Sequence, residues 1–162
     1  MKFEPPNIHH LNAAQGWLEL GDPVEAVGEL NQVSPELQQS PEVLEIRWQI
    51  LAREKQWEKC VACANTLVES APEHPQGWIH RSYALHELKR TREAFDALLP
   101  ALAKFPKEWL IQYNLACYCC RMKEFQRSLD HLEQACQLGD ARSIKAMALK
   151  DPDLLEVRNL LP

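Results

Sequence analysis

Cysteine and histidine are the residue types in this sequence whose spacing suits metal or redox chemistry. Cys60 and Cys63 have the Cys-x-x-Cys spacing that zinc sites and redox-active thiols use. However, Cys60 falls at a position that holds a small residue at each 34-residue step along the chain, and no second cysteine pair follows at zinc-ribbon spacing. We therefore expect this pair to pack between helices.

A second arrangement involves Cys117, Cys120 and His86. The two cysteines lie three residues apart, and His86 stands 34 positions before Cys120, so the three side chains are predicted neighbours. Two thiolates and one imidazole form an incomplete tetrahedral zinc site, which needs a fourth ligand. The favoured role is again packing, with cysteine acting as a small apolar side chain. We predict no metal and no other cofactor.

Motifs for catalysis are missing from the sequence. His9, His10 and His74 have neither an HExxH context nor a histidine four residues away. No serine sits in a GxSxG turn, and no paired carboxylates stand in a predicted cleft. With only 5 glycines, the chain offers no glycine-rich phosphate loop. We predict that the protein is not an enzyme.

Length and composition indicate one globular domain. The chain has 162 residues, of which 46% are hydrophobic and 25% charged, and its formal net charge is −5. The absence of a basic run argues against nucleic acid or an anionic membrane as a partner. The sequence has neither a signal-peptide pattern at its start nor 18 uninterrupted apolar residues. Six cysteines without a secretory signal are typical of reduced thiols, so we expect a cytoplasmic protein.

The elements that position these side chains follow a period of 34 residues, which is the strongest pattern in the sequence. Small residues recur at Ala26, Cys60, Ala94 and Ser128, and apolar residues recur at Leu30, Ala64, Leu98 and Leu132, at Val33, Leu67, Ala101 and Ala135, and at Trp17, Leu51, Leu85 and Cys119. A fifth series, Ala14, Trp48, Ser82 and Ala116, is small in three of its four members. The copies are 7–40, 41–74, 75–108 and 109–142, with a short flexible lead at 1–6 and a capping helical segment at 143–162.

Each copy contains two blocks of apolar residues at helical spacing, which predicts an all-α fold without strands. Ser40-Pro41-Glu42 is typical of a helix start with a serine cap, and Asp151-Pro152-Asp153 has the same arrangement before a predicted last helix. Pro100 lies within a second helix and predicts a kink there. The tryptophans are expected in the core: Trp17, Trp48, Trp57, Trp78 and Trp109.

The period, the two helices and the regular spacing of small residues resemble the tetratricopeptide repeat. Copy 75–108 fits best, with Trp78, Ser82, Ala94, Leu98 and Pro106 at the positions that the repeat prescribes. The resemblance implies a right-handed superhelical α-solenoid of antiparallel helix pairs with a C-terminal cap. Trp48 departs from it, because a small residue is usual there. This predicts either a widened helix pair or a tryptophan turned outward to another partner. The segment from Asn114 to Asp153 is similar to bacterial members, which favours a bacterial source.

The resemblance also implies a binding face along the concave side, lined by the first helix of each repeat. Carried over position by position, the candidate peptide-binding residues are Asn12, Gln15, Gln49, Arg53, His80, Tyr83, His86, Tyr113, Asn114, Cys117 and Arg121. The C-terminal half is the richer one in aromatic residues and arginine, which dominate binding hot spots. A clamp for chaperone C-terminal carboxylates is not expected, because Glu42, Glu45 and Ile46 stand where basic residues would be needed.

Together these patterns predict a non-catalytic protein-interaction module that binds a peptide segment of a partner protein. One alternative is a small secretion chaperone of the same repeat family, although such proteins usually carry three repeats and a longer N-terminal segment. The other is a repeat protein that self-associates through its end faces or closes a thiolate metal site.

Overall fold

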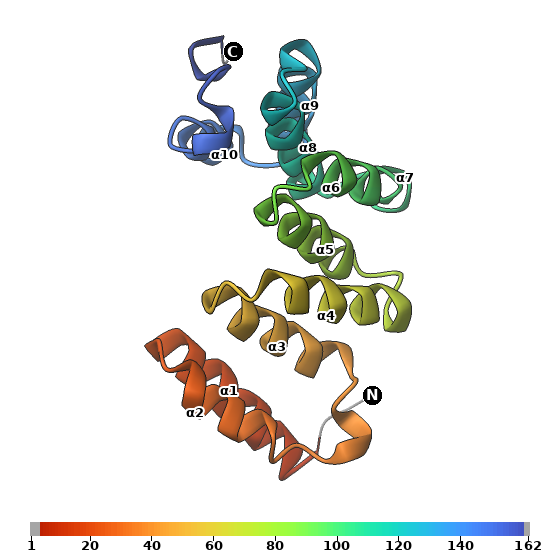
Figure 1. Ribbon diagram of the computed structural model, residues 1–162, viewed down its shortest axis with the longest axis vertical. Helices are drawn as coiled ribbons and strands as arrows, with labels where there is room; N and C mark the ends of the chain where they lie inside the picture. Colours follow the sequence, from red (N-terminus) through yellow and green to blue (C-terminus); the bar gives the residue numbers. More distant parts are fainter. Residues whose placement is uncertain (1–3, 161–162) are drawn as a thin grey trace. The chain divides into compact units, whose positions relative to one another are not determined.

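The computed structural model describes residues 4–160, so parts of the predicted lead 1–6 and of the predicted cap 143–162 lie outside the described residues. Across residues 4–160 the backbone forms helices and turns and contains no strand, which confirms the all-α prediction (Figure 1). No helix in this range has both the length and the apolar character required to cross a membrane. The chain divides into two compact units, residues 1–80 and 81–162, and the division falls within helix α5 (Pro75–Glu87).

The N-terminal unit consists of helix pairs with one apolar core. Its elements are α1 (Asn7–Leu20), α2 (Pro23–Leu30), the short 3-10 turn η1 (Pro35–Leu37), α3 (Pro41–Arg53) and α4 (Trp57–Ser70). Helix α1 packs against α2, and α3 packs against α4 as well as against α1 and α2. Leu18, Leu30 and Val43 are buried in the shared core.

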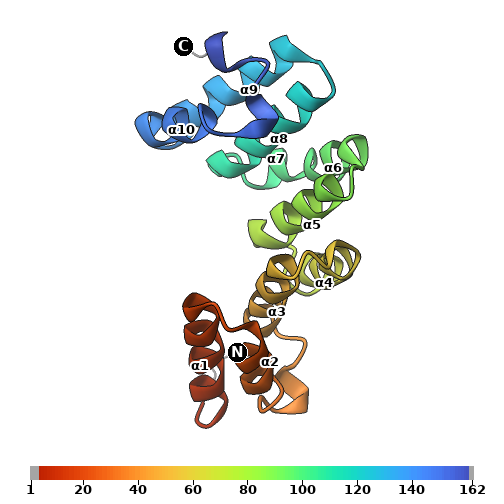
Figure 2. The same ribbon diagram turned by 60° about the vertical axis from the view of Figure 1, so that its left-hand side comes forward.

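The C-terminal unit continues the pattern of helix pairs and ends in short turns. Its elements after α5 are α6 (Thr91–Leu98), α7 (Ala101–Lys104), α8 (Trp109–Arg121), α9 (Phe125–Leu138), α10 (Ala141–Ala148) and the 3-10 turns η2 (Pro152–Leu154) and η3 (Arg158–Leu160). Helix α8 packs against α6, α7 and α9, while α10 packs against α9 (Figure 2). The turn η2 packs on α8.

The residues that recur every 34 positions are the ones that fill the space between helices. The fully buried members include Ala14, Ala26, Cys60, Ala64, Ala94, Leu98, Ala101, Ala116, Cys119 and Ala135, each with 0% exposure. Small side chains at these points let paired helices approach closely, so the repeated sequence columns correspond to repeated packing positions.

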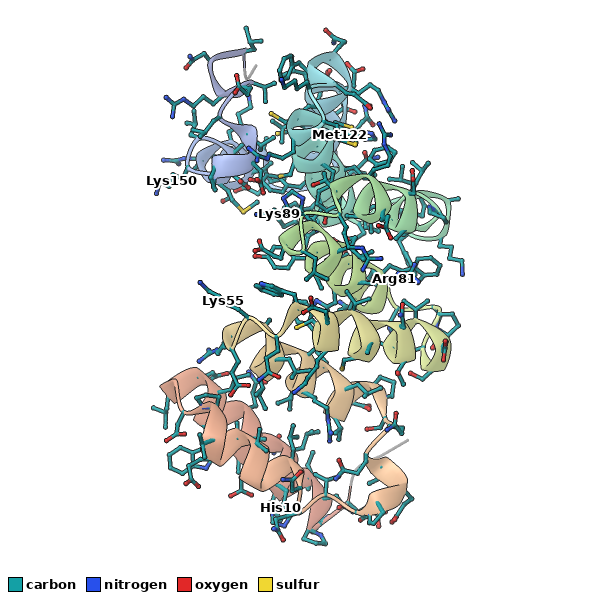
Figure 3. All side chains as sticks on the ribbon, in the orientation of Figure 1. His10, Lys55, Arg81, Lys89, Met122 and Lys150 are labelled. Carbon is teal, nitrogen blue, oxygen red and sulfur yellow. The ribbon has the colours of Figure 1, made fainter. Side chains whose placement is uncertain are left out.

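The turn between the two helices of each copy is repeated in the backbone as well. Gly21, Lys55, Lys89 and Lys123, each 34 residues after the last, have φ values of 86°, 56°, 64° and 64° (Figure 3 labels Lys55 and Lys89). After each of these residues, the next backbone N–H donates to the carbonyl five residues before it, as in Asp22 N to Trp17 O at 2.9 Å and Glu124 N to Cys119 O at 2.9 Å. This is the Schellman helix ending, which requires a left-handed residue and favours glycine.

Lysine in this left-handed position is strained, so Lys123→Gly should stabilise the protein. The left-handed conformation costs a non-glycine residue about 1–2 kcal/mol, and the greater freedom of glycine in the unfolded chain offsets part of the gain. We expect the free energy of unfolding to rise by about 0.5–1 kcal/mol. Urea unfolding followed by circular dichroism measures the change. Lys145→Gly, inside α10, is the control and should instead destabilise by about 1 kcal/mol. An equal effect of the two substitutions would contradict this account of the turn.

Two local predictions need correction. Ser40 precedes α3 as predicted, but its side chain makes no capping hydrogen bond, and its buried hydroxyl has no partner. At Pro100 the helix is interrupted rather than kinked, because α6 ends at Leu98 and α7 begins at Ala101. The missing N–H of proline, together with its ring, explains the interruption.

The tryptophans also differ from the prediction of a common core role. Only Trp48 is buried, at 8% exposure, whereas Trp17 is 37% exposed and the others are half-buried. Trp48 lies flat against the imidazole of His80, with ring centroids 3.9 Å apart and an angle of 9° between the planes. The large side chain thus turns toward the next first helix of the same chain and is buried there, so the predicted outward turn to another partner is wrong.

Candidate functional site

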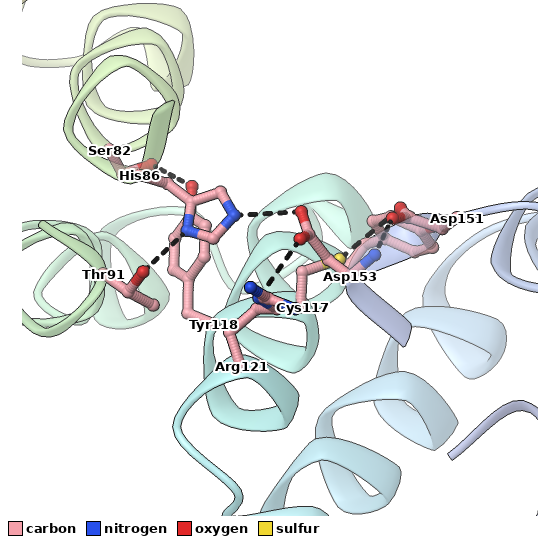
Figure 4. A network of polar contacts seen from close by, with 9 residues as sticks. Ser82, His86, Thr91, Cys117, Tyr118, Arg121, Asp151 and Asp153 are labelled. Carbon is pink, nitrogen blue, oxygen red and sulfur yellow. Dashed lines mark hydrogen bonds and ion pairs between the residues drawn. The ribbon is translucent and has the colours of Figure 1, made fainter. Parts of the chain in front are cut away.

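The candidate site is built around an acidic turn that follows α10. Asp151 Oδ1 accepts a hydrogen bond from the backbone N–H of Asp153 at 2.9 Å, and Pro152 occupies the first position of the 3-10 turn η2. The predicted capping role of Asp151 is therefore confirmed, but it begins a three-residue 3-10 turn and not an α-helix. This geometry directs both aspartate side chains toward first-helix residues of the C-terminal unit (Figure 4).

Asp153 binds a histidine and an arginine of that face. Its Oδ2 lies 2.9 Å from His86 Nε2, and its Oδ1 lies 3.6 Å from Arg121 Nε. The other ring nitrogen, His86 Nδ1, lies 3.0 Å from the hydroxyl of Thr91. Because an ionised carboxylate only accepts, His86 Nε2 must carry a proton and donate it to Asp153.

Asp151 is held by α8. Its Oδ2 accepts from the Tyr113 hydroxyl at 2.8 Å and from the Cys117 thiol at 3.7 Å. Burial first, and then the neighbouring Cys117 and Asp151, raise the pKa of Tyr113, so its hydroxyl stays protonated and donates. Burial likewise raises the pKa of the Cys117 thiol. Both groups are therefore neutral donors to a carboxylate.

Buried side chains next to these contacts hold the imidazole of His86 in place. The ring of Tyr118 lies 4.9 Å from that of His86, centroid to centroid, and its hydroxyl donates to Ser82 Oγ at 3.1 Å. Leu154 and Val157, which follow the acidic turn in the C-terminal segment, have no exposed surface. The acidic turn is thus held both by polar contacts and by apolar anchors that follow it.

The structure brings together most of the predicted binding residues of the C-terminal half. His86, Tyr113 and Cys117 are buried and contact the acidic turn directly, and Arg121 is exposed beside it. Tyr83 is 41% exposed and Asn114 half-buried. An open depression of about 400 Å³ adjoins the turn; its lining residues are Tyr83, Glu87, Met147, Lys150, Asp151, Pro152 and Asp153.

The predicted residues of the N-terminal unit form no comparable cluster. Asn12 and Arg53 are exposed, and Gln49 is half-buried. Gln15 donates to Glu19 on its own helix at 3.2 Å. His80, besides its stacking on Trp48, lies 3.7 Å from Glu45. The Gln15 contact stays within one helix, and the contacts of His80 join it to α3, so these contacts connect repeat helices and hold no segment from outside the repeats.

The six cysteines are free thiols, and all except Cys136 are buried. Burial raises the pKa of Cys60 and of Cys63 to about 11. The Cys63 thiol donates to the carbonyl of Leu44 at 3.3 Å, and Cys60 lies against the carbonyl of Trp48. Such protonated thiols are poor nucleophiles and poor metal ligands. No cluster of histidine, cysteine and acidic side chains with metal-site geometry exists among residues 4–160.

Asp153 makes the stability of the acidic turn depend on pH. Its hydrogen bond to His86 lowers the pKa of its carboxyl below the ordinary 3.8, with smaller contributions from the charges of His86, Arg121 and Lys89, while burial opposes the shift. Because the unfolded chain takes up a proton first as the pH falls, the stabilisation is complete above about pH 4 and is lost below it.

We therefore expect Asp153→Asn to be about 1 kcal/mol less stable than the natural chain at pH 6, since the side chain is partly solvated. The difference should shrink as the pH falls below about 4, and it should vanish once the pH lies below the lowered pKa of the Asp153 carboxyl in the folded chain, where the natural chain is protonated too. Urea unfolding at a series of pH values measures it. A difference that stays constant down to pH 3 would show that the charge of Asp153 contributes nothing.

Sequence reasoning missed the acidic turn and Thr91 as members of the site. The signal that was available is the Asp-Pro-Asp sequence itself, which was interpreted only as a helix cap. The carboxylate of Asp151 both caps the turn and contacts the first-helix face, because its Oδ1 accepts from the turn while its Oδ2 accepts from Tyr113.

Comparisons with known protein structures identify the fold. No protein-family profile matches the chain, and no curated protein matches it in sequence. Among solved structures, a thermophilic TPR protein of Thermus thermophilus is similar over 93% of this chain and 80% of its own, with a TM-score of 0.77 and 19% identity. A structure of MamA from Desulfovibrio magneticus RS-1, which covers that protein from residue 41 to its end, is also similar. The similarity extends over 98% of this chain and 92% of the MamA chain, with a TM-score of 0.72 and 17% identity.

A double mutant of MamA RS-1 is similar over 86% of this chain and 79% of its own, with a TM-score of 0.71 and 15% identity. At these identities the likeness concerns the fold, and it agrees with the 34-residue period and the repeated turns. The bacterial source stays a prediction. The chain therefore has the helical-repeat fold of tetratricopeptide proteins.

Proposed function

We propose that this protein is a non-catalytic interaction module that binds a peptide segment of a partner protein along the first helices of its repeats. One observation carries the proposal: in the C-terminal unit, that face already holds a segment from outside the four repeats. His86, Tyr113, Cys117 and Arg121 all contact the acidic turn at residues 151–153. A surface that binds a short acidic turn of its own chain has the donors to bind a segment of similar chemistry from a partner.

The exposed part of this face has the composition of a binding surface. Tyr83, Asn114 and Arg121 combine an aromatic ring, an amide and a guanidinium group. Tyr83 lines the depression beside the acidic turn, Arg121 is exposed and lies against Asp153, and Asn114 is half-buried on α8. Tyrosine and arginine are enriched at the energetic centres of protein interfaces. The free and mostly buried thiols support our further proposal that the protein acts in the cytoplasm.

Affinity capture from a lysate of the source cell tests this function. The variant Tyr83→Ala/Asn114→Ala/Arg121→Ala should lose a partner that the natural chain retains. The matched control is Phe125→Ala/Gln134→Ala/Arg142→Ala, which removes the same side-chain types from exposed positions on α9 and α10. Helicity must be unchanged in both variants. If both variants keep the same partners, the first-helix face is not the binding surface.

A further inference from the structure

Side chains of α5 and α8 contact three of the four oxygens of two carboxylates. Asp153 Oδ2 is bound by His86 and its Oδ1 by Arg121, while Asp151 Oδ2 is bound by Tyr113 and Cys117. The fourth oxygen, Asp151 Oδ1, accepts from within the turn. His86 is only 6% exposed, so without a carboxylate its protonated nitrogen would be buried next to no acceptor. The face is thus built for a pair of carboxylates in particular.

Charge is distributed along the chain in a way that favours an acidic ligand at this face. Residues 81–162 contain 13 lysines and arginines against 11 aspartates and glutamates, a net charge of +2, although this count includes the acidic turn itself. Residues 1–80 contain 5 against 12, a net charge of −7. An acidic peptide is therefore attracted to the C-terminal unit and repelled by the N-terminal one.

We propose that these donors form a binding site for paired carboxylates, that the turn Asp151-Pro152-Asp153 is its resident ligand, and that the partner presents an Asp-x-Asp segment followed by an apolar residue that displaces this turn. This inference rests on the proposed function and names the chemistry of the partner segment. The apolar residue takes the place of Leu154, which is buried directly after the turn.

The site differs from a clamp for a chain terminus. Its donors stand at positions 12 of the third copy (His86) and 5, 9 and 13 of the fourth (Tyr113, Cys117 and Arg121), whereas the clamp needs basic residues and asparagine at positions 2, 5, 6 and 9. Both carboxylates here are side chains two residues apart, and their turn is followed by further chain. The ligand is therefore an internal acidic turn.

The resident turn also regulates access. A tethered segment competes at a local concentration on the order of millimolar, so the natural chain binds a free acidic peptide weakly. The open depression beside the turn, lined by Tyr83 and Glu87 among others, gives a partner a first point of contact before the turn leaves. Weakening the resident carboxylates should therefore strengthen binding of an added acidic segment.

Fluorescence anisotropy with a labelled peptide that copies residues 148–157 tests the proposal on the full chain. Asp151→Asn/Asp153→Asn should bind this peptide at least ten times more tightly than the natural chain does. The control Asp96→Asn/Asp130→Asn removes the same charge from exposed positions and should bind like the natural chain. A peptide with both aspartates replaced by asparagine should bind at least ten times more weakly, and adding Arg121→Gln to the double variant should weaken binding of the acidic peptide.

Equal binding by the double variant and the natural chain, or equal binding of the acidic and neutral peptides, would overturn the proposal. If the double variant loses helicity, amide hydrogen exchange of the natural chain decides instead. Millimolar acidic peptide should accelerate exchange at residues 151–157 and neutral peptide should not; no acceleration overturns the proposal. If the peptide tests fail while the Tyr83/Asn114/Arg121 variant still loses its captured partner, the proposed function stands without the carboxylate preference.

Discussion

Leu154→Ala should lower the free energy of unfolding of the C-terminal unit by about 2–5 kcal/mol, the range for truncating a fully buried leucine. Leu154 has 0% exposure, and it follows directly on the turn whose aspartates contact His86 and Tyr113. Removing its side chain therefore takes away the apolar anchor of the acidic turn as well as its own packing. Urea unfolding monitored by circular dichroism, with hydrogen exchange at residues 151–157, measures both effects.

The neighbouring leucine provides the control for this experiment. Leu155 is 50% exposed, so Leu155→Ala removes the same atoms from the same segment with an expected loss of less than about 1 kcal/mol. Equal losses for the two variants would mean that the C-terminal segment is only loosely attached. That result would also remove the basis for treating the acidic turn as a resident ligand.

The helices were predictable because the information that determines them is local and repeated. The 34-residue period placed small residues such as Ala26 and Ala94 between helices, and the structure buries both completely. Where a single residue decides the local geometry, prediction was weaker. Ser40 has the right type for a cap but makes no such bond, and Pro100 interrupts its helix instead of bending it.

The position of the acidic turn could not be predicted from the sequence, because its contacts connect residues that are far apart in the chain. His86 and Asp153 are separated by 67 residues, and Tyr113 and Asp151 by 38. No periodicity relates a residue beyond the last repeat to a residue within an earlier one. The family resemblance named His86, Tyr113, Cys117 and Arg121 as binding residues, and the structure places all four against the acidic turn, but the resemblance said nothing about this turn.

Trp48→Ala should destabilise the N-terminal unit by about 3–5 kcal/mol, although it restores the small residue that the repeat pattern favours at this position. Sequence comparison within the chain suggests the opposite, because the equivalent residues are Ala14, Ser82 and Ala116. The structure explains the reversal. Trp48 is 8% exposed and stacks on His80, so alanine would leave a cavity and an imidazole without its ring partner.

Trp17→Ala is the matched control, because Trp17 lies in the same unit and is 37% exposed. We expect its loss to stay near or below about 1 kcal/mol in the same urea titration. Should Trp48→Ala prove neutral or stabilising, the small residue of the repeat would be the better fit and the stacking on His80 would carry no stability. A large loss would show that this copy has replaced close helix packing by an aromatic contact with the next first helix.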